Sequence, residues 1–359
     1  MNILIMAGGR GERFWPVSSP STPKQILPII SDKTMIEETV DRLLGFAEYK
    51  NIFISTNSLL KPKIKKLIPA IPSGNFILEP CARNTAAAIG LGAVYIQNRD
   101  PGSVMAVLPA DHFIAEKDIF LSDLQIAGQL AKETGCLITF GIKPSRIETG
   151  YGYIELGEVV HNAYENSAYE VKSFREKPDQ ETAREYVNRQ EFLWNSGMFI
   201  WSVSSIMESI EKYMPVMFSG LMEISENLGT RKESETVQRN FEKFEKTSID
   251  YGVMEKADNA LCIRARFTWD DVGSWTAVER FNKKDEQNNM VRSDWKGVDT
   301  SGSIIVNDRG LVCTLGVDNL LVIKQGDIVL VADKRREQEI KKIIESLQAD
   351  GKLKKYLDV

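Results

Sequence analysis

The chain has 359 residues, which suits one large domain with a smaller one beside it. A hydrophobic content of 43% and a charged content of 26% are typical of a globular protein that buries a core. The net charge of −5 argues against a dedicated nucleic-acid binder, although it leaves room for a local basic pocket.

The sequence has no pattern typical of a secretion signal and no apolar run long enough to cross a membrane. The four scattered cysteines lack CxxC spacing, which favours reduced thiols in a cytoplasmic protein. Two histidines, His112 and His161, are too few for a structural zinc site. Any metal is therefore expected to be a hard cation bound by carboxylates.

The first thirty residues carry the densest motif. An apolar run over residues 2–6 predicts a buried strand, and MAGGRGERFWPVSSPSTPKQILP begins at its last residue. Three glycines within four positions allow backbone N–H groups to face phosphate oxygens. With two arginines and Lys24 nearby, the segment predicts a site for a polyanion such as a triphosphate. It matches neither the P-loop pattern GxxxxGK[ST] nor the dinucleotide pattern GxGxxG.

After this motif, helical and strand patterns alternate. Amphipathic spacing predicts helices over residues 34–46 and 59–67, and apolar runs predict strands over 51–55 and 75–79. The lysines of the second helix are interpreted as a solvated face. An alanine-rich helix then begins near residue 84. Its small residues suit either close packing on a sheet or the approach of a ligand to its first turn.

Residues 104–108 predict a central strand that ends just before Asp111. Open α/β sheets bind ligands beyond the carboxyl ends of their strands, which makes Asp111 a candidate Mg²⁺ ligand. The alternative is an aspartate that caps the next turn. A helix over residues 117–134 and a strand over 135–140 continue the alternation. The pattern predicts an α/β fold with a Rossmann-like, mainly parallel sheet flanked by helices.

The second half of the chain departs from this alternation. Strands are predicted over residues 149–155, 168–174 and 192–201, and a largely helical stretch over 202–255. A further strand over 261–267 leads into an acidic segment. The composition changes near residue 282, so we divide the chain into a large domain (1–282) and a small β-rich domain with a terminal helix (283–359).

From Met1 to about Phe281 the chain resembles the sugar-1-phosphate nucleotidylyltransferases, in collinear order and over at least five motif blocks. The FWP, PKQ and NSGMF details are most similar to the branch that joins mannose 1-phosphate to a guanine nucleotide. Glu12 stands where many members have threonine, and this branch tolerates glutamate there. The resemblance implies a nucleotide-diphospho-sugar transferase fold. It also implies short β-helix-like coils in the C-terminal domain, through which we expect a homodimer.

The resemblance implies roles for individual residues. The catalytic set that handles the phosphates comprises Arg13, Lys24 and Lys177. The nucleotide-binding set comprises Ala7, Gly8, Gly9, Arg10, Gly11, Glu79, Arg83, Asn84 and Thr85. The set that binds the sugar phosphate comprises Gly152, Glu176, Lys177 and Asn195.

Asp111 and Asp271 are the Mg²⁺ ligands that the resemblance implies. The neighbouring Asp270 is expected to point elsewhere, because adjacent side chains on an extended segment face opposite ways. Asp250 is a possible supporting group for the sugar site.

These expectations describe an enzyme that transfers GMP from GTP to α-D-mannose 1-phosphate, with Mg²⁺ as cofactor and those two substrates as partners. No nucleic-acid or membrane partner is expected. Two alternatives stay open: another pairing in the same class, such as glucose 1-phosphate with dTTP, UTP or ATP, and a non-catalytic sensor of sugar nucleotides. Such a sensor is expected to lose its lysine or its metal carboxylates, and this chain has both.

Overall fold

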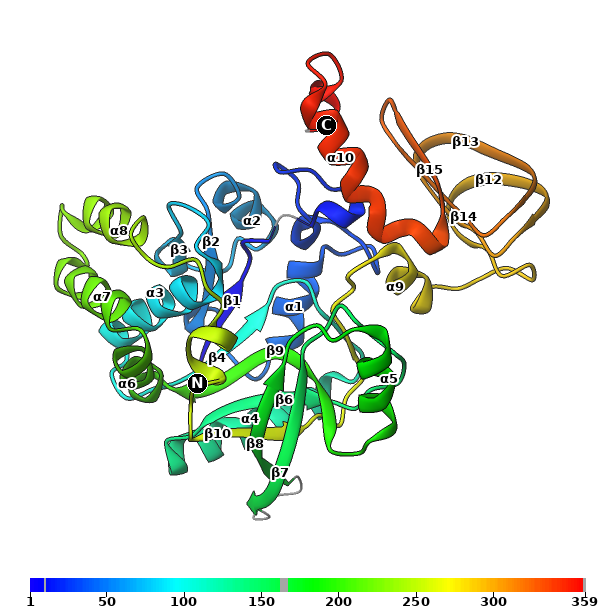
Figure 1. The fold of residues 1–359 in the computed structure, drawn as a ribbon. Coiled ribbons are helices and arrows are strands. Elements are labelled where there is room, and N and C mark those ends of the chain that lie inside the picture. The colour runs from blue at the N-terminus through cyan, green and yellow to red at the C-terminus, as the bar shows by residue number, and fades with distance from the viewer. Residues whose placement is uncertain (10, 162–166, 358–359) are drawn as a thin grey trace. The chain divides into compact units, whose positions relative to one another are not determined.

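The computed structural model describes residues 1–9, 11–161 and 167–357 (Figure 1). Its contacts divide the chain into two compact units. Unit 1 comprises Met1–Gly8, Val40–Ala110 and Ile114–Trp269, and unit 2 comprises Gly9–Thr39, Asp111–Phe113 and Asp270–Val359. The chain therefore leaves and re-enters each unit, and the sequence-based division at residue 282 stays a prediction.

Unit 1 is built on a nine-stranded sheet with the order β3-β2-β1-β4-β9-β6-β10-β8-β7. Its centre is apolar, as the strand runs predict: every residue of β2 is buried. The strands are β1 (Asn2–Met6), β2 (Ile52–Thr56), β3 (Phe76–Leu78), β4 (Val104–Pro109), β6 (Leu137–Ile142), β7 (Tyr153–His161), β8 (Ala168–Arg175), β9 (Phe192–Ser202) and β10 (Ala260–Arg264). Two-residue strands, β5 (Phe113–Ile114) and β11 (Trp269–Asp270), lie outside this sheet.

The sheet is mixed. Strands β1, β2, β3 and β4 pair in parallel, as do β6 and β10. Strand β9 lies antiparallel between β4 and β6, and β7 and β8 form an antiparallel pair. The antiparallel part coincides with the region in which the sequence stops alternating between strand and helix. Helices flank the sheet, so the predicted α/β class is confirmed.

The helices of unit 1 pack mainly through small and aliphatic side chains. The core joins β1, β2 and β4 to α3 and α6, with Leu4, Phe53 and Val107 among its buried residues. A Cβ built on Gly92 of α3 would lie 2.4 Å from Leu4 Cδ2, so this glycine allows close packing on β1. The helices are α1 (Met35–Leu43, beginning in unit 2), α2 (Lys61–Leu67), α3 (Asn84–Arg99), α4 (Lys117–Thr134), α5 (Gln180–Asn188), α6 (Val203–Tyr213), α7 (Pro215–Asn227) and α8 (Glu233–Phe241), with a π-helix at Asp250–Met254.

Unit 2 joins the N-terminal motif to the C-terminal region. Its four-stranded sheet has the order β12-β13-β14-β15, parallel up to β14 and closed by an antiparallel hairpin. One core contains Phe14 from the motif, Trp275, and Ile344 near the C-terminus. The elements are 3₁₀ helices at Glu12–Phe14, Lys24–Ile26 and Lys334–Glu339, α9 (Trp275–Arg280), β12 (Met290–Ser301), β13 (Ile304–Asp318), β14 (Leu320–Gln325), β15 (Ile328–Asp333) and α10 (Ile340–Ala349).

Two further observations concern the whole described chain. Among the described residues, no helix has the length and apolar character that crossing a bilayer requires. The four cysteines all have free thiols, which agrees with the prediction of reduced thiols.

Candidate active site

Gly11 fixes the geometry of the N-terminal motif in unit 2. Its φ of +61° lies in the left-handed region, and it precedes the 3₁₀ helix Glu12–Phe14. A Cβ at this position would lie 2.6 Å from Lys24 Cβ, a distance that real atoms do not adopt. Ser18 Oγ donates a hydrogen bond to the Gly11 carbonyl at 2.6 Å. Glycine is thus required for both the turn and the close approach of Lys24.

Lys24 is buried and joins two acidic residues from distant parts of the sequence. Its side chain is only 6% exposed, and its Nζ lies 2.9 Å from Asp111 Oδ2. The same ammonium donates to the main-chain oxygen of Asp271 at 2.5 Å. The lysine predicted to bind phosphates therefore contacts both residues predicted to bind metal. In this structure its charge is balanced by a carboxylate.

Arg13 and the side chain of Asp271 complete this cluster. A Cβ built on Gly273 would lie 2.8 Å from Asp271 Oδ2 and 3.0 Å from an Arg13 guanidinium nitrogen, so both groups converge beside that glycine. Burial alone would raise the pKa of Asp111, but the charges of Lys24, His112 and Arg13 outweigh it and lower the pKa. Unit 2 thus brings together Arg13, Lys24, Asp111 and Asp271, which we call the phosphate cluster.

Asp270, the neighbour of Asp271, has partners of its own. Its carboxylate is buried and accepts a hydrogen bond from Arg280 at 2.6 Å and another from the Val272 amide at 2.8 Å. An aspartate held in this way has a structural ion pair with Arg280. The choice of Asp271 rather than Asp270 as the metal ligand stays a prediction.

Unit 1 holds Glu79 beside the end of β1. Ser55 Oγ donates to Glu79 Oε1 at 2.8 Å, and a Cβ built on Gly8 would lie 3.4 Å from the same oxygen. Ala7 is buried and its amide donates to the Ser55 carbonyl at 2.8 Å. Burial raises the pKa of Glu79, and the hydrogen bond from Ser55 opposes that shift. Ser55 was not predicted; its only signal in the sequence is a polar residue near the end of a buried strand.

The first turn of α3 and the preceding Arg83 are held by hydrogen bonds. Asn84 has a φ of +67°, and its Oδ1 accepts from the Thr85 amide at 2.8 Å. Thr85 Oγ1 accepts from the Ile249 amide at 2.9 Å, so this side chain links α3 to the π-helix region. Arg83 donates to the Glu242 carbonyl, while its Nε has no partner among the described residues. Of this group, Arg83 retains an unused donor.

Three of the residues predicted to bind the sugar phosphate meet in unit 1. A Cβ built on Gly152 would lie 2.7 Å from Glu176 Oε2 and 3.5 Å from Asn195 Cβ. Asn195 Nδ2 donates to Asp250 Oδ1 at 2.7 Å. Burial raises the pKa of Asp250, the bond from Asn195 opposes this, and the charge of Glu176 adds to the rise. Asp250 begins a π-helix, an element that is frequent at functional sites.

Lys177 lies at the surface of unit 1, whereas Gly9 accepts a hydrogen bond within unit 2. The Lys177 side chain is 65% exposed, and its Nζ lies 3.4 Å from Glu176 Oε1. Its φ of +41° is unusual for a residue other than glycine. The Gly9 carbonyl accepts from Gln25 Nε2 at 3.0 Å. Arg10, also predicted to bind nucleotide, lies outside the described residues.

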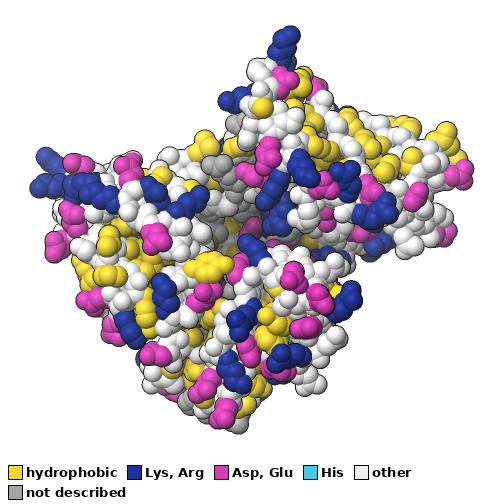
Figure 2. Space-filling view, in the orientation of Figure 1, with side chains coloured by type: hydrophobic (Ala, Val, Ile, Leu, Met, Phe, Trp, Pro, Cys, Tyr) yellow, Lys and Arg dark blue, Asp and Glu magenta, His cyan; other side chains and the backbone are white. Residues whose placement is uncertain are grey.

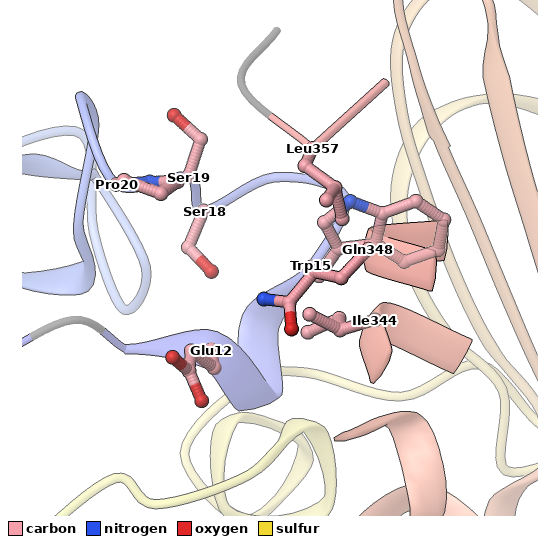
Figure 3. Close-up of a pocket in the computed structure, with 8 residues that line it drawn as sticks. All are labelled: Glu12, Trp15, Ser18, Ser19, Pro20, Ile344, Gln348 and Leu357. Atoms are coloured by element: carbon pink, nitrogen blue, oxygen red, sulfur yellow. The ribbon is translucent and has the colours of Figure 1, made fainter. Parts of the chain in front are cut away.

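The one pocket shown in close-up is separate from these clusters. It lies in unit 2 between the motif and α10, and Figure 3 shows Glu12, Ser18 and Gln348 around it with Trp15 forming one wall. Its volume is about 60 Å³, which holds a few water molecules and is too small for a nucleotide. Among the described residues, no group of three or more His, Cys, Asp or Glu side chains is arranged to hold a metal ion.

Comparison with known proteins places this geometry in context. Residues 2–288 match the family model described as nucleotidyl transferase, and residues 296–347 match a MannoseP isomerase/GMP-like beta-helix domain. The mannose-1-phosphate guanylyltransferase of Escherichia coli (strain K12) is 36% identical over 358 residues, covering 97% of this chain and 74% of that protein.

Two solved structures are also similar. The crystal structure of a protein titled mannose-1-phosphate geranyltransferase, from Thermus thermophilus, matches with a TM-score of 0.87 and 33% identity, covering 97% of this chain and 99% of that chain. A mannose-6-phosphate isomerase from Helicobacter pylori matches with a TM-score of 0.58 and 25% identity, covering 75% of this chain and 98% of that chain. The first match extends over nearly the whole of both chains.

Proposed function

Since this chain belongs to the nucleotidyl transferase family, and within it to the mannose-1-phosphate guanylyltransferases, we propose that it transfers GMP from GTP to α-D-mannose 1-phosphate and releases pyrophosphate. The observation that carries this proposal is the phosphate cluster, in which Arg13, Lys24, Asp111 and Asp271 converge. A non-catalytic sensor would have no need to keep two cations against two carboxylates in this way.

The reaction needs charge neutralisation and positioning more than proton transfer. A phosphate monoester has a second pKa near ~6, so mannose 1-phosphate is largely dianionic at neutral pH and attacks the α-phosphorus without a general base. The bond from the α-phosphorus to the bridging oxygen of pyrophosphate breaks as the new P–O bond forms. In our proposal Arg13 and Lys24 hold the triphosphate and stabilise the charge that develops on the leaving pyrophosphate.

The donor set of the phosphate cluster fits Mg²⁺. This ion commonly binds through one or two carboxylates together with substrate phosphates, and the cluster offers Asp111 and Asp271. The cationic Lys24 on Asp111 Oδ2 also marks that oxygen as a position favourable to a cation. We propose these two aspartates as the ligands. When bound, the ion would offset phosphate charge and align the reacting groups.

Unit 1 supplies the remaining recognition in our proposal. Residues at the end of β1 and before α3 would contact the base and ribose: Ala7, Gly8, Glu79, Arg83, Asn84 and Thr85. The mannose hydroxyls would bind Gly152, Glu176 and Asn195, whose convergence supports this assignment, and Lys177 would pair with the sugar phosphate. The unused Nε of Arg83 supports a role for that residue in ligand binding.

We also propose a division of the chain into a catalytic domain (1–282) and a small C-terminal domain (283–359), with a homodimer formed through the sheet β12–β15. Figure 2 shows apolar side chains gathered over these strands. Leu315 of β13 is 73% exposed and lies opposite the exposed Val298 of β12. An apolar face of this kind suits a symmetric interface with a second copy.

Light scattering tests the dimer directly. Leu315→Lys is expected to convert the dimer to a monomer, whereas Val216→Lys, at a 77% exposed position of α7, is expected to leave the mass unchanged. An unchanged dimer mass in Leu315→Lys would remove this face from the interface. The free thiols support the further proposal that the protein works in the cytoplasm.

Pyrophosphate release tests the activity. Purified protein with Mg²⁺ is offered four nucleoside triphosphates, each with mannose 1-phosphate or glucose 1-phosphate. Release confined to GTP with mannose 1-phosphate is the expected result. Release with another pair would keep the mechanism and discard the guanine and mannose assignment. No release from any pair, in a folded protein that still binds sugar nucleotides, would contradict the proposal.

A further inference from the structure

The ion pair between Lys24 and Asp111 has a consequence for metal binding. Asp111 Oδ2 accepts from the Lys24 ammonium at 2.9 Å, and the Asp271 main chain accepts from the same ammonium at 2.5 Å. We propose that Lys24 competes with the divalent metal for Asp111, so that the metal binds tightly only after a nucleoside triphosphate has drawn the lysine away. This inference rests on the proposed function.

On that carboxylate the two cations would repel each other. A Mg²⁺ ion binds a carboxylate oxygen at about 2.0–2.1 Å. With the ammonium 2.9 Å from Asp111 Oδ2, a metal ion on that same oxygen would lie within about 5 Å of it. The Lys24 side chain is only 6% exposed, so solvent screens this repulsion poorly.

The net charge of the phosphate cluster also favours weak binding of a metal ion in the absence of nucleotide. Two carboxylates, Asp111 and Asp271, are accompanied by two cations, Lys24 and Arg13. A dication added alone therefore meets little net negative charge. A triphosphate brings several negative charges and strong acceptors for the ammonium, and it frees Asp111 for the metal.

The Lys24 ammonium needs to move only a short distance from Asp111 to reach a bound triphosphate. Its Cβ is held against Gly11, which fixes the stem of the side chain, while the flexible end can exchange acceptors. Because Gly11 belongs to the loop proposed to face the phosphates, the nucleotide would arrive beside the lysine. Lys24 thus couples the two binding events, and by linkage the metal must raise nucleotide affinity by the same factor.

Direct titration of Mn²⁺, followed by its electron paramagnetic resonance signal, tests this coupling without turnover. The wild-type protein is titrated alone and with the α,β-methylene analogue of GTP, which cannot release pyrophosphate. We expect the analogue to tighten Mn²⁺ binding by a factor within the range of about 5- to 150-fold typical of coupled sites. Equal Mn²⁺ affinity with and without bound analogue would overturn the inference and leave the proposed function intact.

Two variants isolate the lysine. Lys24→Met keeps the length of the side chain and removes its charge, so Mn²⁺ alone should bind several-fold more tightly than to wild type, and the effect of the analogue should shrink. Lys24→Arg keeps the charge and should keep weak binding of Mn²⁺ alone. Melting temperatures verify that both variants fold. Weaker binding of Mn²⁺ alone to Lys24→Met would contradict the competition. If the wild type binds no analogue at all, the proposed function fails together with this inference.

Discussion

The predicted site carboxylates of the two units have different partners. In unit 2, the Asp111 side chain is 31% exposed, and the charges of Lys24, His112 and Arg13 outweigh its partial desolvation and lower its pKa. In unit 1, burial raises the pKa of Glu79, which accepts from the neutral Ser55, and that of Asp250, which accepts from the neutral Asn195. At these predicted site residues, the carboxylate of unit 2 is paired with cations, and the two carboxylates of unit 1 accept hydrogen bonds from neutral donors.

The difference matches two kinds of work. A neutral donor that fixes one oxygen of a carboxylate leaves the other oxygen oriented toward a sugar hydroxyl or the edge of a base. Such a carboxylate suits substrate recognition. Cations beside carboxylates can move to substrate phosphates while the carboxylates bind a metal ion. Such a cluster suits stabilisation of the charge that develops in the transition state. Variants in unit 2 should therefore lower turnover, whereas variants in unit 1 should first weaken binding.

The largest effect is expected at the phosphate cluster. Lys24→Ala and Asp271→Ala should each lower kcat by about 10²–10³, as the loss of one preorganised charge contact does elsewhere. Pyrophosphate release under saturating substrates measures this. Lys50→Ala, at an exposed surface pair with Glu48, serves as the control and should retain full turnover. Turnover within a few-fold of wild type would remove Lys24 or Asp271 from the cluster's function.

Gly11→Ala should act on the same cluster indirectly. Alanine at a φ of +61° costs about 1–2 kcal/mol, and its Cβ would press on Lys24. We expect a lower free energy of unfolding in urea and a turnover reduced by about tenfold to 10²-fold, because a misplaced lysine stabilises the transition state poorly. Gly9→Ala is the matched folding control, since no described atom lies within 4 Å of a Cβ there. Equal stability of the two variants would contradict the close approach of Lys24.

In unit 1, Asn195→Ala should remove the hydrogen bond that Asp250 accepts from Asn195. The expected result is a KM for mannose 1-phosphate raised by about tenfold, on the scale of one lost hydrogen bond to a charged group, with little change in the KM for GTP. Initial rates at varied sugar phosphate measure it. Asn195→Ala should also lower the free energy of unfolding. The double variant Asn195→Ala with Asp250→Ala should recover part of that loss. A larger change in the KM for GTP than in that for mannose 1-phosphate would contradict the assignment.

The smallest effect concerns the pH dependence of stability at Glu79. Because its pKa is raised in the fold, its contribution is complete below the unfolded value near 4.5 and is lost as pH rises through the folded value. Glu79→Gln removes this ionisation while keeping an acceptor for Ser55. We compare the Tm of the variant with that of wild type at two pH values. The difference in Tm, variant minus wild type, should be about 1–2 °C larger at pH 7.5 than at pH 4.5. A pH-independent difference would refute the shift.

Local sequence patterns were sufficient to predict the positions of helices and strands with a clear hydrophobic periodicity. The helix predicted over residues 117–134 is α4 at both ends, and the run predicted over 104–108 lies within β4, because long apolar periods leave few alternatives. The terminal helix predicted for the C-terminal domain starts as a 3₁₀ helix, Lys334–Glu339, and becomes α10 at Ile340. The ends of helices and strands depend on tertiary contacts, which hydrophobic periodicity does not reveal.

Long-range pairings could not be predicted from the sequence. Nothing in the run over 192–201 indicates that β9 lies antiparallel between β4 and β6, since a fully buried strand has the same apolar character in either direction. The motif around Lys24 indicated a phosphate-binding lysine but not that Asp111 would hold its ammonium. Residue types report which groups attract phosphate, and only the fold decides which partner each one contacts.

Two-substrate initial rates for Asp111→Asn and Glu176→Gln test the division of labour most directly. The account predicts that Asp111→Asn lowers kcat and weakens metal dependence, while Glu176→Gln mainly raises the KM for mannose 1-phosphate. If Glu176→Gln instead altered the KM for GTP, or if Asp111→Asn kept wild-type kcat, the assignment of charge stabilisation to unit 2 and sugar recognition to unit 1 would be wrong.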